Sequence, residues 1–133
     1  MKKLLTYTAL ATLSLSSISY GETCPDPDSF IITKERHIIA VGLPDLWYIH
    51  ENIINDPDTS IHFVRSTWYS DQKTVWCEYA GDNQYSSAYI TIHSKIETQE
   101  PRSNTWIKKN YPSGSRRRQC VSTNINTCYF IQD

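Results

Sequence analysis

A strict alternation of apolar and polar side chains between Ala88 and Ile96 constrains the fold more than any other feature of the sequence. The apolar positions are Ala88, Ile90, Ile92 and Ile96, and the positions between them carry Tyr89, Thr91, His93 and Lys95. A period of two residues is typical of a β-strand, because successive side chains point to opposite faces of a sheet. The segment therefore predicts an antiparallel strand with one face buried and the other open to solvent.

Short runs of β-branched and aromatic residues recur along the rest of the chain, with turn residues between them. The runs that predict strands cover residues 30–33, 37–41, 61–69, 74–80 and 105–107, and residues 119–122 and 127–131 predict a final hairpin. Residues 46–54 fit either a helix or a strand around Trp47, and we favour the strand. About eight short strands without a sustained helical period predict an all-β fold, a small antiparallel sandwich or open barrel.

Four cysteines, Cys24, Cys77, Cys120 and Cys128, predict two disulfides. Zinc is the competing interpretation, but the chain has no C-x-x-C pair and no histidine at ligand spacing from a cysteine. Four cysteines allow three pairings. We favour Cys120–Cys128 with Cys24–Cys77, because a hairpin that turns near Asn124 would place Cys120 and Cys128 opposite each other. The other two pairings stay open at this point.

The first 21 residues have the three regions of a signal peptide. Lys2 and Lys3 precede an apolar stretch at residues 4–15, and small residues at Ser19 and Gly21 predict cleavage before Glu22. The apolar stretch is too short and too rich in Thr and Ser for a stable membrane anchor. Residues 22–133 are then expected to form a single exported domain, periplasmic or secreted, with no membrane span.

The charge of the chain gives no case for nucleic-acid binding, and we expect no nucleic-acid partner. Thirteen basic and 14 acidic residues give a net charge of −1, and loss of the two leader lysines would make it −3. Two Asp-Pro-Asp clusters, at residues 26–28 and 56–58, lack the loop pattern of a calcium site. Their prolines favour turns, so we expect no metal and no cofactor.

A set of cysteines and aromatic residues carries a family resemblance. The set is Cys24-Pro25, Trp47, Phe63, Cys77-x-Tyr79, Trp106, Cys120 and Cys128-x-Phe130. Its arrangement resembles an uncharacterised family of small secreted bacterial proteins, over nearly all of residues 22–133. The resemblance implies export and a disulfide-tied β domain, and it supplies no catalytic residues.

Two features are candidate contact surfaces for a partner. Arg116, Arg117 and Arg118 form a basic run that would attract an acidic partner from a loop, although a solvated loop is the more common role of such runs. Trp68 and Trp76 are candidate aromatic contacts, because exposed tryptophans often serve binding surfaces. A small core also needs bulky aromatic side chains, so burial of these rings is the alternative.

The leading functional hypothesis is an exported, non-enzymatic binding protein for a protein or a glycan, such as an inhibitor, an immunity factor or a host-directed factor. One alternative is a small secreted hydrolase, for example a ribonuclease that uses His62 and His93 as acid and base. Another is a structural component of the cell envelope. No catalytic residue is assigned, and the sequence leaves the partner and the oligomeric state open.

Overall fold

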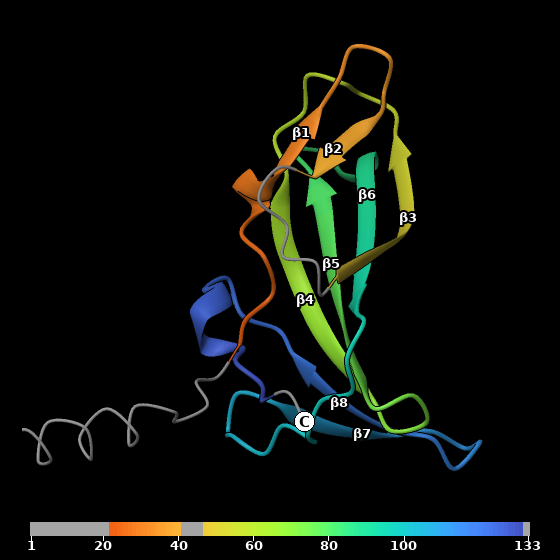
Figure 1. The fold of residues 1–133 in the computed structure, drawn as a ribbon, viewed down its shortest axis with the longest axis vertical. Helices are drawn as coiled ribbons and strands as arrows, with labels where there is room; N and C mark the ends of the chain where they lie inside the picture. Colours follow the sequence, from red (N-terminus) through yellow and green to blue (C-terminus); the bar gives the residue numbers. More distant parts are fainter. Residues whose placement is uncertain (1–21, 41–46, 132–133) are drawn as a thin grey trace, which may run out of the picture.

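The computed structural model describes residues 22–40 and 47–131, and these residues form eight strands and two short 3₁₀ helices (Figure 1). The strands are β1 (Phe30–Ile32), β2 (Ile38–Ala40), β3 (Trp47–Ile54), β4 (His62–Tyr69), β5 (Thr74–Gly81), β6 (Gln84–Ser94), β7 (Ile107–Asn110) and β8 (Arg116–Cys120). The 3₁₀ helices are η1 (Pro27–Ser29) and η2 (Ile125–Thr127). In this part of the chain, no helix has the length and apolar character that crossing a membrane requires.

All strand pairs are antiparallel, as expected for short strands joined by tight turns. Strands β1 and β2 form a hairpin, and the other six form one sheet in the order β3-β6-β5-β4-β8-β7. In Figure 1 the β1–β2 hairpin lies at one end of the large sheet and the β7–β8 hairpin at the other. The predicted antiparallel all-β fold is confirmed.

The core lies on one face of the large sheet. Val75, Cys77 and Tyr79 of β5 are fully buried, as are Ile90 and Ile92 of β6, because alternate residues of a strand share a face. The strand predicted from residues 88–96 ends at Ser94, so its last apolar residue, Ile96, lies beyond the sheet and is 38% exposed.

Segments from both ends of the chain cover the core face. The ring of Phe30 packs edge-on against Tyr79 at 4.8 Å, and Phe130 packs against Trp47 at 5.9 Å between ring centroids. The backbones of Glu22 and Phe130 form an antiparallel bridge with hydrogen bonds of 2.6 and 2.7 Å. The two ends of the described chain therefore meet over the same core.

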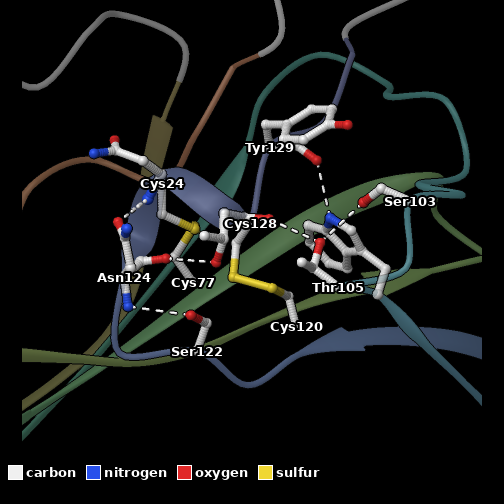
Figure 2. Close-up of a disulfide and its surroundings, with 12 residues drawn as sticks. Cys24, Cys77, Ser103, Thr105, Cys120, Ser122, Asn124, Cys128 and Tyr129 are labelled. Atoms are coloured by element: carbon white, nitrogen blue, oxygen red, sulfur yellow. Dashed lines mark hydrogen bonds between the residues drawn. A yellow bond between two sulfur atoms is a disulfide. The ribbon is translucent and has the colours of Figure 1, made fainter.

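Both predicted disulfides are present, Cys24–Cys77 and Cys120–Cys128, and the strand predicted around Trp47 is confirmed as β3. Leu46, the first residue of that predicted segment, lies outside the described residues. The first disulfide ties the N-terminal segment to the centre of β5. The second closes a short loop after β8, next to the turn that carries Asn124 (Figure 2).

The predicted final hairpin is wrong. Strand β8 ends at Cys120, and the chain then forms η2 instead of returning along β8. The side chain of Asn124 accepts a hydrogen bond of 3.1 Å from the backbone N–H of Asn126 and so caps η2. The compact turn still brings the Cα atoms of Cys120 and Cys128 to 5.7 Å, which is within the range of a disulfide.

The arginine run does not lie in a loop. Arg116, Arg117 and Arg118 belong to β8, which pairs with both β4 and β7. Residues 105–107 were expected to form a short strand, and β7 instead begins at Ile107 and ends at Asn110. Strand geometry divides the three arginines between the two faces of the sheet.

Candidate binding face

The second face of the large sheet, opposite the core, is the candidate site and is called the open face here. Its side chains are the alternate residues that do not enter the core. Those with described contacts on this face include Tyr48, His50, Arg65, Thr67, Tyr69, Trp76, Glu78, Tyr89, Thr91, His93, Arg117 and Gln119. The set is aromatic and polar, which is unusual for a face that serves only to be solvated.

An aromatic row crosses the open face from β3 to β4 and consists of Tyr48, His50, His93, Trp76 and Tyr69. The ring of His93 stacks on the ring of Trp76 with 4.7 Å between the ring centroids, and the centroid of the Tyr48 ring lies 5.3 Å from that of His93. His50 and Tyr69 meet Trp76 edge-on at 4.6 and 5.8 Å. Each ring thus holds its neighbour in place, and the half-buried Trp76 lies at the centre of the row.

Cations lie against both ends of the aromatic row. The Nζ atom of Lys95 lies 4.6 Å from the centre of the Tyr48 ring. At the other end, the guanidinium of Arg117 lies 4.8 Å from the Tyr69 ring and 4.0 Å from the Tyr111 ring. These distances are typical of cation–π contacts, which hold a charged side chain in place without neutralising it.

An ion pair lies on the floor of the open face beside Trp76. The Nε atom of Arg65 lies 3.0 Å from one oxygen of Glu78, and Tyr89 donates a hydrogen bond of 3.0 Å to the other oxygen. Arg65 also donates a hydrogen bond of 2.9 Å to the hydroxyl of Tyr85, which raises the pKa of Arg65. The pair is thus held between two tyrosines, in a defined orientation.

These groups surround one pocket of about 340 Å³. Its lining residues are His50, Arg65, Thr67, Tyr69, Trp76, Glu78, Tyr89, Thr91 and Gln119. Burial raises the pKa of Tyr69, so its hydroxyl stays protonated to a higher pH than that of an exposed tyrosine. The hydroxyl oxygen of Thr91 is buried without a hydrogen-bond partner in the described structure, so one polar group of the pocket lining is unsatisfied.

The structure brings together two of the five residues predicted for binding. Trp76 and Arg117 lie on the open face and are linked through Tyr69. Arg118 lies on the opposite face, with its Nε atom 3.4 Å from Glu100, and Arg116 is exposed at the start of β8. Trp68 is only 4% exposed and belongs to the core.

The two histidines of the hydrolase hypothesis lie apart. His62 pairs with Ala80 of β5, and its Nε2 atom lies 2.8 Å from Asp82, whereas His93 pairs with Trp76. These two positions, Ala80 and Trp76, are four residues apart along β5, which corresponds to about 13 Å. The histidine that does approach His93 is His50, at 5.9 Å between ring centroids.

Some of the pocket residues that were not predicted from the sequence could have been found from the alternation of the strands. Alternation within residues 74–80 places Trp76 and Glu78 together on the face opposite Val75, Cys77 and Tyr79. Nothing comparable marks His50, which lies at an irregularity in the pairing of β3 with β6.

The described residues contain no group of three or more His, Cys, Asp or Glu side chains placed to hold a metal ion. Comparisons with family models, with curated proteins and with solved structures gave no match to the chain. The family resemblance in the cysteine and aromatic spacing therefore stays a prediction.

Proposed function

We propose that this protein is a non-enzymatic binding protein that holds a carbohydrate chain in the pocket of its open face. The observation that carries the proposal is the position of Trp76 beside the Arg65–Glu78 pair in one pocket. A sugar ring has apolar C–H faces and a rim of hydroxyl groups. A site for a sugar ring therefore needs both a flat aromatic surface and oriented polar groups. Binding sites for small ligands commonly combine these two features.

The polar groups of the pocket match hydroxyl chemistry. A sugar hydroxyl both donates and accepts hydrogen bonds, so its site needs groups of both kinds. Glu78 supplies acceptor oxygens, Arg65 supplies donors, and the amide of Gln119 supplies an acceptor oxygen and two N–H donors.

The covalent framework supports a location outside the cytoplasm. Two disulfides are consistent with an oxidising compartment, and residues 1–21 predict export. We therefore assign the binding protein to the periplasm or the secreted space. Bacterial envelopes and host surfaces both present carbohydrate there.

The test is a glycan array with protein produced from the full chain, followed by calorimetric titration of the glycans retained. We expect Trp76→Ala to weaken binding at least tenfold, or about 1.4 kcal/mol. The matched control is Tyr129→Ala, which removes another exposed aromatic ring away from the open face and should leave affinity within about threefold. Retention of no glycan, or equal affinity for wild type and Trp76→Ala, would overturn the proposal.

A second candidate function is acid–base hydrolysis, because His50 and Glu78 line the same pocket. One imidazole and one carboxylate are groups that hydrolases use to transfer protons. RNA and cell-wall polymer are the substrates to assay, with His50→Gln compared to His62→Gln. Turnover that is lost in His50→Gln and kept in His62→Gln would replace the binding proposal with hydrolysis at this pocket. Absence of turnover in the wild type would eliminate this candidate.

A further inference from the structure

The β7–β8 hairpin carries five cations, Lys108, Lys109, Arg116, Arg117 and Arg118, and is called the basic hairpin here. We infer that the bound carbohydrate is acidic, bearing carboxylate or sulfate groups, and that Lys109 and Arg117 bind those groups. The inference rests on the proposed function and narrows it to one class of ligand. It follows from strand register, side-chain partners and the position of the hairpin beside the pocket.

Register places like charges directly opposite each other in the basic hairpin. Lys109 pairs with Arg117, and Lys108 pairs with Arg118. Like charges at opposed positions destabilise a sheet, so this arrangement costs folding free energy in the free protein. An anion between the two side chains of a pair would convert that repulsion into attraction.

The two pairs differ in what surrounds them. Arg118 has a carboxylate partner on its own face, Glu100. For Lys109 and Arg117, the described residues provide no ion pair. The Nε atom of Arg117 is also buried without a hydrogen-bond partner there, while the guanidinium is fixed between the Tyr69 and Tyr111 rings. Arg117 is therefore a positioned cation that has no ion-pair partner among the described residues.

Lys109 and Arg117 belong to the same face as the pocket. Opposed residues of a ladder project to the same side, and Arg117 contacts Tyr69, which lines the pocket. The next pair along this face is Ile107 with Gln119, and Gln119 also lines the pocket. A chain of sugar rings stacked on Trp76 and Tyr69 would therefore reach the two cations from the pocket.

The floor of the pocket favours an acidic glycan over a nucleic acid. A single-stranded nucleic acid would also find aromatic rings and cations on a sheet face. Its phosphates, however, would approach Glu78 in the pocket. An acidic glycan carries hydroxyls between its anionic groups, and those hydroxyls can donate to Glu78.

The experiment compares polygalacturonate, its neutral methyl ester, heparin and a single-stranded oligonucleotide by calorimetric titration at low and physiological salt. We expect polygalacturonate or heparin to bind at least tenfold more tightly than the neutral ester, with the difference shrinking as salt rises. Polygalacturonate carries carboxylates only, whereas heparin carries sulfates and carboxylates, so binding of heparin without binding of polygalacturonate would indicate sulfate recognition. Preference for the oligonucleotide, or equal affinity for the acidic and neutral polymers, would overturn the inference.

The chain offers a charge-matched control. The variant Lys109→Gln/Arg117→Gln removes two charges from the open face, and Lys108→Gln/Arg116→Gln removes two from the other face of the same hairpin. We expect the first to lose at least tenfold in affinity for the acidic polymer and the second at most threefold. The single variant Lys109→Gln changes only an exposed side chain, so it tests the loss of one open-face charge without disturbing the packing of Arg117. Equal losses in both double variants would mean unspecific attraction and would overturn the inference.

The outcomes for the two proposals are distinguishable. If Trp76→Ala abolishes binding of acidic and neutral polymers alike while Lys109→Gln/Arg117→Gln changes neither, the proposed function stands and the acidic-ligand inference fails. If none of the carbohydrates binds the wild-type protein, the proposed function itself fails and the inference fails with it.

Discussion

The hydroxyl of Tyr79 donates a hydrogen bond to the backbone carbonyl of Pro25, which joins the centre of β5 to the N-terminal segment next to Cys24. Tyr79 is fully buried, and its ring packs against both Phe30 and Phe63. Burial raises the pKa of Tyr79 far above its ordinary value of 10.0, because the phenolate would lose its hydration. The neutral hydroxyl is thus part of what holds this segment on the core.

This relationship predicts a loss of stability in alkaline solution. A raised pKa in the folded state means that the folded protein binds the Tyr79 proton more tightly than the unfolded chain does. The corresponding stability is complete below the unfolded pKa of about 10 and is lost as the pH rises above it. We expect the melting temperature to fall steeply above about pH 10.

The matched variant for this test is Tyr79→Phe, which keeps the ring and removes the titrating group. It should be less stable than wild type at neutral pH by about 1 kcal/mol, through loss of the hydrogen bond. Its alkaline decline should be shallower than that of wild type. Parallel alkaline curves for the two proteins, measured by circular dichroism, would contradict the assignment to Tyr79.

The two disulfides should differ in their contribution to stability. Cys24 and Cys77 are 53 residues apart, and Cys120 and Cys128 are 8 apart. Because a cross-link restricts the unfolded chain more when it closes a longer loop, we expect losses of about 4 and about 2.5 kcal/mol. Guanidinium unfolding of the two double alanine variants would measure this, and a larger loss from removing Cys120–Cys128 would argue against it.

Replacing Lys109 with Glu should stabilise the free protein. The substitution places a carboxylate opposite Arg117, where two cations now face each other. We expect a gain of about 0.2–1 kcal/mol at low salt that decreases as salt rises. Urea titrations at two salt concentrations provide the measurement. Lys109→Glu should nevertheless bind acidic glycan more weakly than wild type. Improved stability with unchanged affinity would mean that the two cations repel each other but that Lys109 does not bind the ligand.

Gly81 is fixed by close packing at the end of β5. A Cβ atom there would lie 2.5 Å from the hydroxyl oxygen of Thr59 and closer still to that of Ser87. These two hydroxyls are hydrogen-bonded at 3.2 Å and accept backbone N–H bonds from Asp82 and Asn83. We expect Gly81→Ala to cost about 1–3 kcal/mol. In a Ser87→Ala background the cost should be smaller, and strictly additive losses in denaturant unfolding would contradict this packing account.

The fold was predictable from sequence because its signals are local. Alternation in residues 74–80 and 88–96, together with the β-branched and aromatic run at residues 61–69, marks the three adjacent strands β4, β5 and β6. The apolar positions of the two alternating segments define the core face. The pairing of Cys120 with Cys128 was also predicted correctly, but the geometry expected to bring the two cysteines together was wrong. A 3₁₀ turn capped by Asn124, rather than a hairpin, brings the two cysteines together.

Much of the open face was not predictable, because bulges change the phase of the alternation. In β4 the register shifts between Phe63 and Arg65. A strict period of two would place both on one face, yet Phe63 packs against Tyr79 in the core and Arg65 meets Glu78 on the open face. A second shift, in β3, surrounds His50. One extra residue in each strand thus re-aims a side chain of the candidate site, and no composition rule marks where that residue falls.

The antiparallel bridge between Glu22 and Phe130 makes the described chain a candidate for circular permutation. A short linker could join the two ends at this bridge, because their backbones already lie within hydrogen-bond distance. New ends could be opened at the turn between β7 and β8, where Gly114 has a positive φ of 83° and its surroundings are open. In such a chain the basic hairpin would be open at its tip, and β4, β5 and β6 would remain continuous. The strands would follow one another in a new order along the chain and would still build the same open face.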